Sequence, residues 1–169
     1  MELRYFKDKE GTEILVPHVY AAKKHVTYKP RGSWNKEKFF EEADKYIPDE
    51  KTRQTLRDLF NFSNQLGNVE FGVGRKIGTF SLSLEYKGSL KKLFFISYNP
   101  GFTWFAFKEM LQQGIKKELV SSYIREIKSL GFEVDEKKAS FNVSFLNDEE
   151  RFDNFKNYYI ALKDKLLSQ

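Results

Sequence analysis

The segment between residues 69 and 107 constrains the fold most strongly, because very short turns separate its apolar stretches. Residues 77–86 alternate along the chain, with one face of Phe80, Leu82, Leu84 and Tyr86 and a second face of Thr79, Ser81, Ser83 and Glu85. Turns at 87–89 and 99–101 lead to further strands at 90–98 and 102–107. Strands joined so closely must pair antiparallel, because a parallel pair needs a crossover of about a dozen residues.

Apolar residues at helical spacing precede this segment. The first predicted helix follows a Ser33 cap and runs to about residue 46, where Pro48 breaks it. Asp49 is a good cap for a second helix, and Gly67 is well placed to end it. The inward face of this second helix is predicted to be Leu56, Leu59, Phe60 and Leu66.

The C-terminal third returns to helix. Residues 116–130 place apolar side chains on one helical face, and Gly131 follows as a stop. Residues 139–145 alternate between apolar and polar, which predicts one further strand. The last helix is expected to begin at Asn147, with Glu150 three residues on in a capping-box arrangement.

The N-terminal residues predict a separate hairpin. Strands are expected at 3–6 and 13–20, and Pro17 makes the second an edge strand or ends it. We therefore expect an N-terminal hairpin and basic linker over 1–30 and a single α+β domain over 31–169. The predicted order is β-β-α-α-β-β-β-β-α-β-α, a mostly antiparallel sheet with helices packed on one face.

Composition excludes several kinds of site. The 169 residues include no cysteine, so disulfides and thiolate metal sites are excluded. No apolar run approaches the roughly 20 residues that span a bilayer, and the N-terminal sequence has no apolar signal core. A cytoplasmic protein with no membrane partner is the expectation, and neither a cofactor nor a metal is predicted.

The whole net charge of +5 lies in residues 17–38, where six basic residues face one acid. Rings are interleaved with these cations, and this combination suits a polyanion with stacked bases. Charge runs are also common in solvated linkers, and that alternative stays open. The residues of this segment that we expect to contact nucleic acid are Lys23, Lys24, Lys29, Arg31 and Trp34.

A second basic pair, Arg75 and Lys76, is surrounded by Gly72, Gly74 and Gly78. A Gly-x-Gly that cradles phosphate requires a strand followed by a helix, whereas here a strand follows a strand. The glycines therefore predict a tight hairpin with positive φ or a bulge. Arg75 and Lys76 at its tip are further candidates to contact a phosphate, with neighbouring hydroxyls from Thr79, Ser81 and Ser83.

The run at 31–39, Arg-Gly-Ser-Trp-Asn-Lys-Glu-Lys-Phe, resembles the opening of a small, poorly characterised α+β module. Residues 68–81 are similar to its central hairpin, although Phe71 stands where that module has a tryptophan or similar ring. The turn at 98–101 and the helices ending at Gly131 and beginning at Asn147 are similar in order and spacing.

That module lies on the C-terminal side of restriction-endonuclease-like (PD-(D/E)XK-type) nuclease domains, and residues 1–30 resemble the tail that joins the two. The resemblance implies an accessory part of a nuclease-type architecture or a stand-alone relative. It implies a nuclease domain as a possible partner, and it carries no catalytic motif of its own.

The residues of the PD-(D/E)XK nuclease motif occur in the right order along the sequence. Asp49 follows Pro48, and Glu85 and Lys87 come later. In a nuclease the two carboxylates would hold Mg²⁺ and the lysine would help to activate water. Asp49 is instead a predicted helix cap, and Glu85 and Lys87 flank a turn. A Mg²⁺-dependent nuclease is therefore the least favoured alternative, and we expect no catalysis.

Two other possibilities rest on few residues. His18 and His25 are the only histidines, and their spacing matches no standard metal site or catalytic triad. The excess of rings, for example Phe102, Trp104 and Phe105, would suit an apolar patch that binds another protein. The sequence thus favours a nucleic-acid-binding or accessory module, with a protein-interaction module as the alternative.

Overall fold

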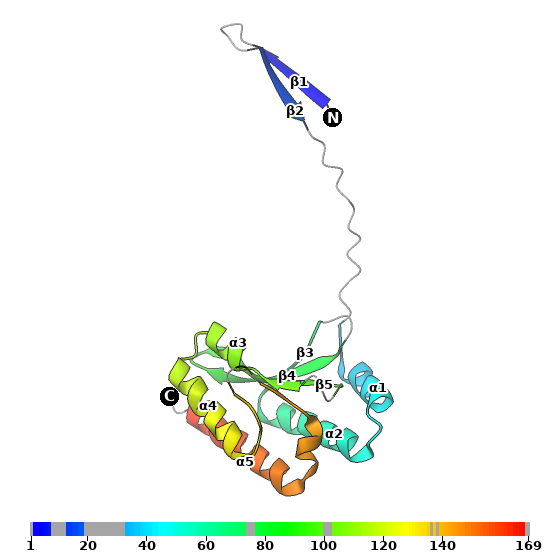
Figure 1. Ribbon diagram of the computed structural model, residues 1–169, viewed down its shortest axis with the longest axis vertical. Coiled ribbons are helices and arrows are strands. Elements are labelled where there is room, and N and C mark those ends of the chain that lie inside the picture. Colours follow the sequence, from blue (N-terminus) through cyan, green and yellow to red (C-terminus); the bar gives the residue numbers. More distant parts are fainter. Residues whose placement is uncertain are drawn as a thin grey trace. The chain divides into compact units, whose positions relative to one another are not determined.

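The computed structural model describes residues 2–7, 13–18, 33–73, 77–99, 103–135, 137 and 139–167, in two units, 1–30 and 31–169 (Figure 1). In the first unit, β1 (Glu2–Lys7) pairs antiparallel with β2 (Glu13–His18). Pro17 lies within β2, opposite Leu3. Both strands of a two-stranded sheet are edges, so the proline removes no interior hydrogen bond.

The second unit contains a five-stranded sheet in the order β3-β4-β5-β6-β7. Its strands are β3 (Asn68–Phe71), β4 (Thr79–Tyr86), β5 (Ser89–Ser97), β6 (Thr103–Phe105) and β7 (Ser140–Phe141). Every neighbouring pair is antiparallel, as the short turns predicted. Between β4 and β5, Lys87 and Gly88 have φ of 51° and 72°, the left-handed geometry of a two-residue hairpin.

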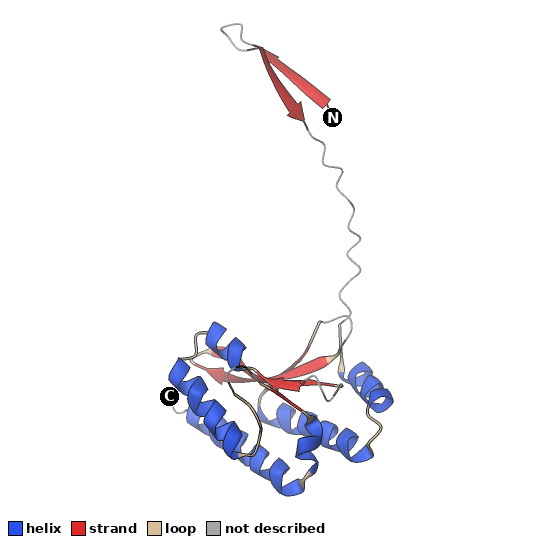
Figure 2. Ribbon diagram, in the orientation of Figure 1, coloured by secondary structure: helices blue, strands red, loops and turns tan. Residues whose placement is uncertain are grey.

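Helices cover one face of this sheet, as predicted (Figure 1, Figure 2). They are α1 (Lys36–Tyr46), α2 (Glu50–Leu66), α4 (Lys117–Ser129) and α5 (Glu149–Leu167). A shorter helix, α3 (Phe107–Gln112), follows β6 and continues alongside β5, where the Ala106 amide donates to the Leu93 carbonyl at 2.8 Å. The fold of the described residues is α+β.

Two elements differ from the predicted order. The strand expected over 102–107 ends at Phe105, because Phe107 turns into the core and stacks on Phe105 with centroids 5.5 Å apart. The strand expected over 139–145 is reduced to Ser140–Phe141. The chain then coils into a 3₁₀ helix, η2 (Val143–Asn147), which begins where Asn142 accepts from the Ser144 amide.

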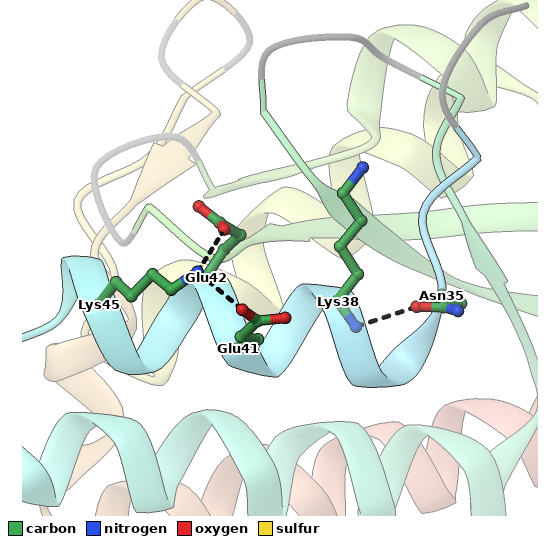
Figure 3. Close-up of polar contacts among 5 residues, drawn as sticks. All are labelled: Asn35, Lys38, Glu41, Glu42 and Lys45. Atoms are coloured by element: carbon green, nitrogen blue, oxygen red, sulfur yellow. Dashed lines mark hydrogen bonds and ion pairs between the residues drawn. The ribbon is translucent and has the colours of Figure 1, made fainter.

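The helix caps agree with the sequence at α2 and differ at α1 and α5. Asp49 caps α2 by accepting from the Thr52 amide at 2.9 Å. At α1 the cap is Asn35 instead of Ser33, and it accepts from the Lys38 amide at 2.9 Å (Figure 3). The helix starts late because Trp34, just before the cap, is buried in the core.

The start of α5 is also one residue later than predicted. Asp148 accepts from the Arg151 amide at 3.0 Å, which is the contact expected of the capping residue. Asn147 belongs to η2, and its side-chain amide donates to the Thr52 hydroxyl at 2.8 Å. Asn147 therefore connects η2 to the start of α2 and does not cap α5.

The core is built largely from rings on the inward face of the sheet. Phe80 of β4 meets Phe39 and Phe60 edge-to-face, with centroids 5.4 and 5.3 Å apart. Phe94 of β5 meets Tyr159 of α5 in the same way at 5.3 Å. Edge-to-face pairs add about 0.5–1.5 kcal/mol each beyond the area that they bury. These contacts hold the helices to one face of the sheet.

One buried polar chain lies inside this core. The Tyr123 hydroxyl donates to the Leu93 carbonyl at 3.2 Å and is hydrogen-bonded to the Tyr159 hydroxyl. The single hydroxyl proton of Tyr123 is thus donated to the Leu93 carbonyl, so in the bond between the two tyrosines the Tyr159 hydroxyl must be the donor. Burial raises the pKa of both phenols well above the usual value, so both stay neutral.

The order of donors in this pair of tyrosines predicts that two matched substitutions lower the unfolding free energy by unequal amounts. Tyr123→Phe leaves the Tyr159 hydroxyl buried without an acceptor, which should cost about 1–3 kcal/mol of unfolding free energy. Tyr159→Phe leaves Tyr123 bonded to Leu93, so its cost should be about 1 kcal/mol or less. Urea unfolding of the two variants measures the difference. A larger loss for Tyr159→Phe than for Tyr123→Phe would contradict this assignment of donors.

Candidate nucleic-acid interface

The face of the sheet opposite the helices presents a row of residues from all five strands. The register places Glu70 opposite Ser81, Ser81 opposite Phe95, Phe95 opposite Trp104, and Trp104 opposite Ser140. Side chains of directly opposed residues point to the same face. These five residues, which we name the outer row, therefore lie side by side across the sheet.

Two rings stand at the centre of the outer row. Phe95 and Trp104 are stacked, with centroids 4.8 Å apart and planes 20° from parallel. Both side chains are half-buried. The Lys92 ammonium lies 5.5 Å from the Phe95 centroid, on the same face of β5. Among the described residues Trp104 makes no second ring contact, and its side chain is partly exposed.

Lys92 is the cation of this surface. Its ammonium pairs with the Glu70 carboxylate at 3.2 Å and lies 3.4 Å from the Ser81 hydroxyl. The two charged side chains are 34% and 51% exposed, and exposed pairs contribute about 0–1 kcal/mol. A phosphate can therefore replace Glu70 as the partner of Lys92 at small cost.

The serines of β4 lie deeper than expected. The alternation predicted a row of hydroxyls facing solvent, yet Ser81 and Ser83 are only 2% and 1% exposed. Lys92 lies opposite Ser83, and its ammonium is 3.4 Å from the Ser81 hydroxyl, so this longer side chain lies beside both serines. The surface is thus formed by rings and one ion pair, and the β4 hydroxyls lie beneath it.

Most of the predicted basic contacts lie outside the described residues. This applies to Lys23, Lys24, Lys29 and Arg31 of the N-terminal segment and to Arg75 and Lys76 between β3 and β4. Lys36 and Lys38, the last lysines of the basic segment, are described. Their ammonium groups lie 5.4 Å from the Phe60 centroid and 4.5 Å from the Trp34 centroid.

Trp34 does not meet the condition for base stacking, which is an exposed ring. It is 8% exposed and packs against Tyr98, with centroids 5.3 Å apart. The indole also lies against Gly78, where an added Cβ would lie 2.5 Å from the ring. Gly78 is thus required for close packing, and its φ is not positive, so a positive φ is not the reason for this glycine.

Three further charged residues of α1, Glu41, Glu42 and Lys45, pair with one another. Lys45 donates to Glu41 at 2.8 Å and to Glu42 at 3.0 Å, as Figure 3 shows. The hydrogen bond from Lys45 lowers the pKa of Glu41. The positive charge of Lys45 is therefore offset by two carboxylates. On the open sheet face, Lys92 is the cation beside the outer row.

The residues of the nuclease motif serve other purposes in the described structure. Asp49 accepts from Thr52 and Asn147 at the start of α2. Glu85 is exposed near the end of β4, and the Lys87 ammonium lies 5.2 Å from the Tyr86 centroid. No group of three or more His, Cys, Asp or Glu in the described part of the chain could hold a metal ion.

The apolar patch expected from Phe102, Trp104 and Phe105 does not form, because the last two residues lie on opposite faces of the sheet. Trp104 lies in the outer row, whereas Phe105 is 0% exposed on the inward face, because neighbouring residues of a strand point to opposite faces. Phe102 lies outside the described residues. The ring beside Trp104 is Phe95, a residue that the sequence did not single out.

The outer row can therefore bind a planar, negatively charged ligand by stacking and ion pairing. No known protein family, curated protein or solved structure matches this chain. None of the helices in the described ranges is long and apolar enough to cross a lipid bilayer.

The capping role of Asp49 predicts a pH dependence. The Thr52 hydroxyl, first among its contacts, lowers the pKa of Asp49 from its usual 3.8. The unfolded state then binds the proton more readily than the folded state does. The stabilisation is therefore complete above the unfolded pKa and is lost as the pH falls through the lower folded pKa.

We expect Asp49→Ala to lower the melting temperature at neutral pH, whereas Asp49→Asn should retain more stability because it keeps a capping oxygen. Below about pH 4 the difference between wild type and Asp49→Ala should shrink. Melting temperatures of the wild type and the two variants, measured from neutral pH to below about pH 4, test this prediction. A gap between the two proteins that stays constant with pH would show that the carboxylate does not cap α2.

Proposed function

We propose that this chain is a non-catalytic module that binds single-stranded nucleic acid through the outer row of its sheet. The observation that carries the proposal is the stacked pair of Phe95 and Trp104 beside Lys92. A base can stack on the exposed part of the indole, and the neighbouring phosphate can pair with Lys92. Nothing in this arrangement requires a metal or a reaction.

The physics of single-strand binding supports this use of the surface. Bases stacked on aromatic side chains contribute about 1–3 kcal/mol each, and every base has a flat face to offer. Several single-strand-binding modules place such rings on the open face of an antiparallel sheet whose other face is covered by helices. A duplex keeps its bases stacked internally, so the same rings would be of little use to it.

The charge of the chain supports the same class of ligand. The net charge is +5, and all of it falls within residues 17–38. Lysines and arginines in that segment would release counterions from the phosphates, which gives affinity without sequence preference. In this proposal the sheet positions one or two bases, and the basic segment adds electrostatic attraction to the backbone.

The resemblance to the module beside restriction-endonuclease-like domains suggests a role for such binding. We propose that the chain is an accessory part of a nuclease-type or restriction-type protein. A separate nuclease domain would supply the metal and the catalytic carboxylates, and this module would hold the strand. The proposal requires no activity from Asp49, Glu85 or Lys87.

Substitutions in the outer row and at the neighbouring Lys92 test the site directly. Trp104→Ala should weaken binding of a fluorescently labelled oligonucleotide about tenfold, the loss expected for one stacked base. Lys92→Ala should weaken it less. Glu70→Gln should strengthen binding, because it removes the carboxylate that competes with phosphate for Lys92. Fluorescence anisotropy with DNA and RNA strands measures all three.

Lys91→Ala is the matched control, because Lys91 neighbours Lys92 but lies on the opposite face of β5, where it lines a pocket. It should leave the affinity unchanged. Circular dichroism confirms that each variant is folded. Equal affinities for wild type, Trp104→Ala and Lys92→Ala would reject the outer row as the binding site. If this chain bound another protein and did not bind oligonucleotides, the result would favour the protein-interaction module instead.

The basic segment makes a separate prediction. Replacing Lys23, Lys24 and Arg31 together by alanine should weaken oligonucleotide binding and make it less sensitive to salt. Three phosphate contacts to a single strand correspond to a change of about 2 in the slope of log affinity against log salt. Titrations at several salt concentrations give this slope. An unchanged slope would show that the segment is a linker without contacts to the ligand.

A further inference from the structure

A cavity of about 260 Å³ lies on the helix-covered side of the sheet. It is enclosed by the ends of β4 and β5, the loop after α3, and the helices α4 and α5. Its apolar lining comes from Leu93, Met110, Ile115, Leu119, Leu162 and Leu166. It shares no residue with the outer row, so it is independent of the proposed nucleic-acid site.

The floor of this cavity is apolar, because it is formed by the buried Leu93 and Met110. Tyr123 lies beside them, and Tyr86 and Tyr158 also line the cavity. The Tyr123 hydroxyl already donates to Leu93 and is bonded to Tyr159. A polar group placed on this floor would lose its hydrogen bonds to water without replacement. The deep part of the ligand must therefore be apolar.

The rim of the cavity is polar, and its charged side chains are Lys91, Lys165 and Glu126. Lys91 is half-buried, and its ammonium donates to the Gln113 carbonyl at 2.8 Å. An ammonium has three N–H groups, and the described residues provide no carboxylate within ion-pairing distance of this one. Gln113 thus holds the Lys91 ammonium at the rim, with donors left for an anion.

The volume limits the size of the ligand. At about 30 Å³ for each water-sized group, the cavity holds on the order of nine non-hydrogen atoms. This excludes a nucleotide or a folded peptide segment. It suits a chain or ring of about eight carbons that ends in a small head group at the rim.

We propose that this cavity binds a small amphiphilic carboxylic acid, with its apolar part on the Leu93–Met110 floor and its carboxylate on the Lys91 ammonium. Ligand pockets of this kind are mostly apolar with a few polar groups that fix orientation. A carboxylate paired with a half-buried ammonium also forms a charge-assisted hydrogen bond, about twice as strong as a neutral one.

Octanoate, with about ten non-hydrogen atoms, is the probe that matches this cavity. The sequence has two methionines, Met1 and Met110, so protein labelled with ¹³C at the methionine methyl reports the cavity through one internal signal. We expect the Met110 signal to shift saturably, with a dissociation constant on the order of 0.1 mM. Absence of a shift at several times that concentration would overturn the proposal.

Matched variants test the role of the head group. Lys91→Met keeps the apolar stem and removes the charge, so it should weaken octanoate binding about tenfold. Binding of octan-1-ol, which has no charge, should be nearly the same in both proteins. Lys92→Met is the control on the opposite face of β5 and should bind octanoate as wild type does. Equal octanoate affinity in the Lys91 and wild-type proteins would overturn the assignment.

A second variant keeps the test decisive if Lys91→Met does not fold. Ser122 lines the cavity from α4 and is half-buried, so Ser122→Phe should fill part of the space. It should abolish the octanoate-dependent shift of Met110 while leaving the circular dichroism spectrum unchanged. Retained binding in this folded variant, or tighter binding of octylammonium than of octanoate by wild type, would contradict the proposal.

Discussion

The pairing of β4 with β5 determines what each face of the sheet can do. Leu82 lies opposite Phe94 and Ser83 opposite Lys92, so Leu93 is an extra residue that forms a bulge. The bulge lets Leu93 and Phe94 both face the core, where each is almost fully buried. Without it, a one-residue shift would move the following side chains to the wrong face.

Two neighbouring lysines just before this bulge point to opposite faces of the sheet. Lys91 lines the apolar cavity among the helices, whereas Lys92 lies beside Phe95 on the open face. Both are held by protein partners, Gln113 for one and Glu70 for the other. Each therefore has a defined position at the edge of an apolar surface, which is the arrangement that suits a ligand with a flat or apolar part and a negative charge.

The sequence predicts the regular parts of this fold well. The strand β4 and the Asp49 cap of α2 follow from local rules, and both are confirmed. Irregular features were missed, because they depend on tertiary contacts. The alternation around Phe107 does not reveal that the ring turns into the core, and nothing near Phe95 shows that a bulge places it beside Trp104. The site could not be predicted without this register.

In the proposed complex Trp104 stacks on a base, whereas Trp34 is buried in the core and does not. The chain has two tryptophans, so each contributes one indole N–H signal to the ¹⁵N-correlated NMR spectrum. Titration with a short single strand should move the Trp104 signal in proportion to occupancy and leave the Trp34 signal in place. Saturable binding that leaves Trp104 unmoved would contradict the account.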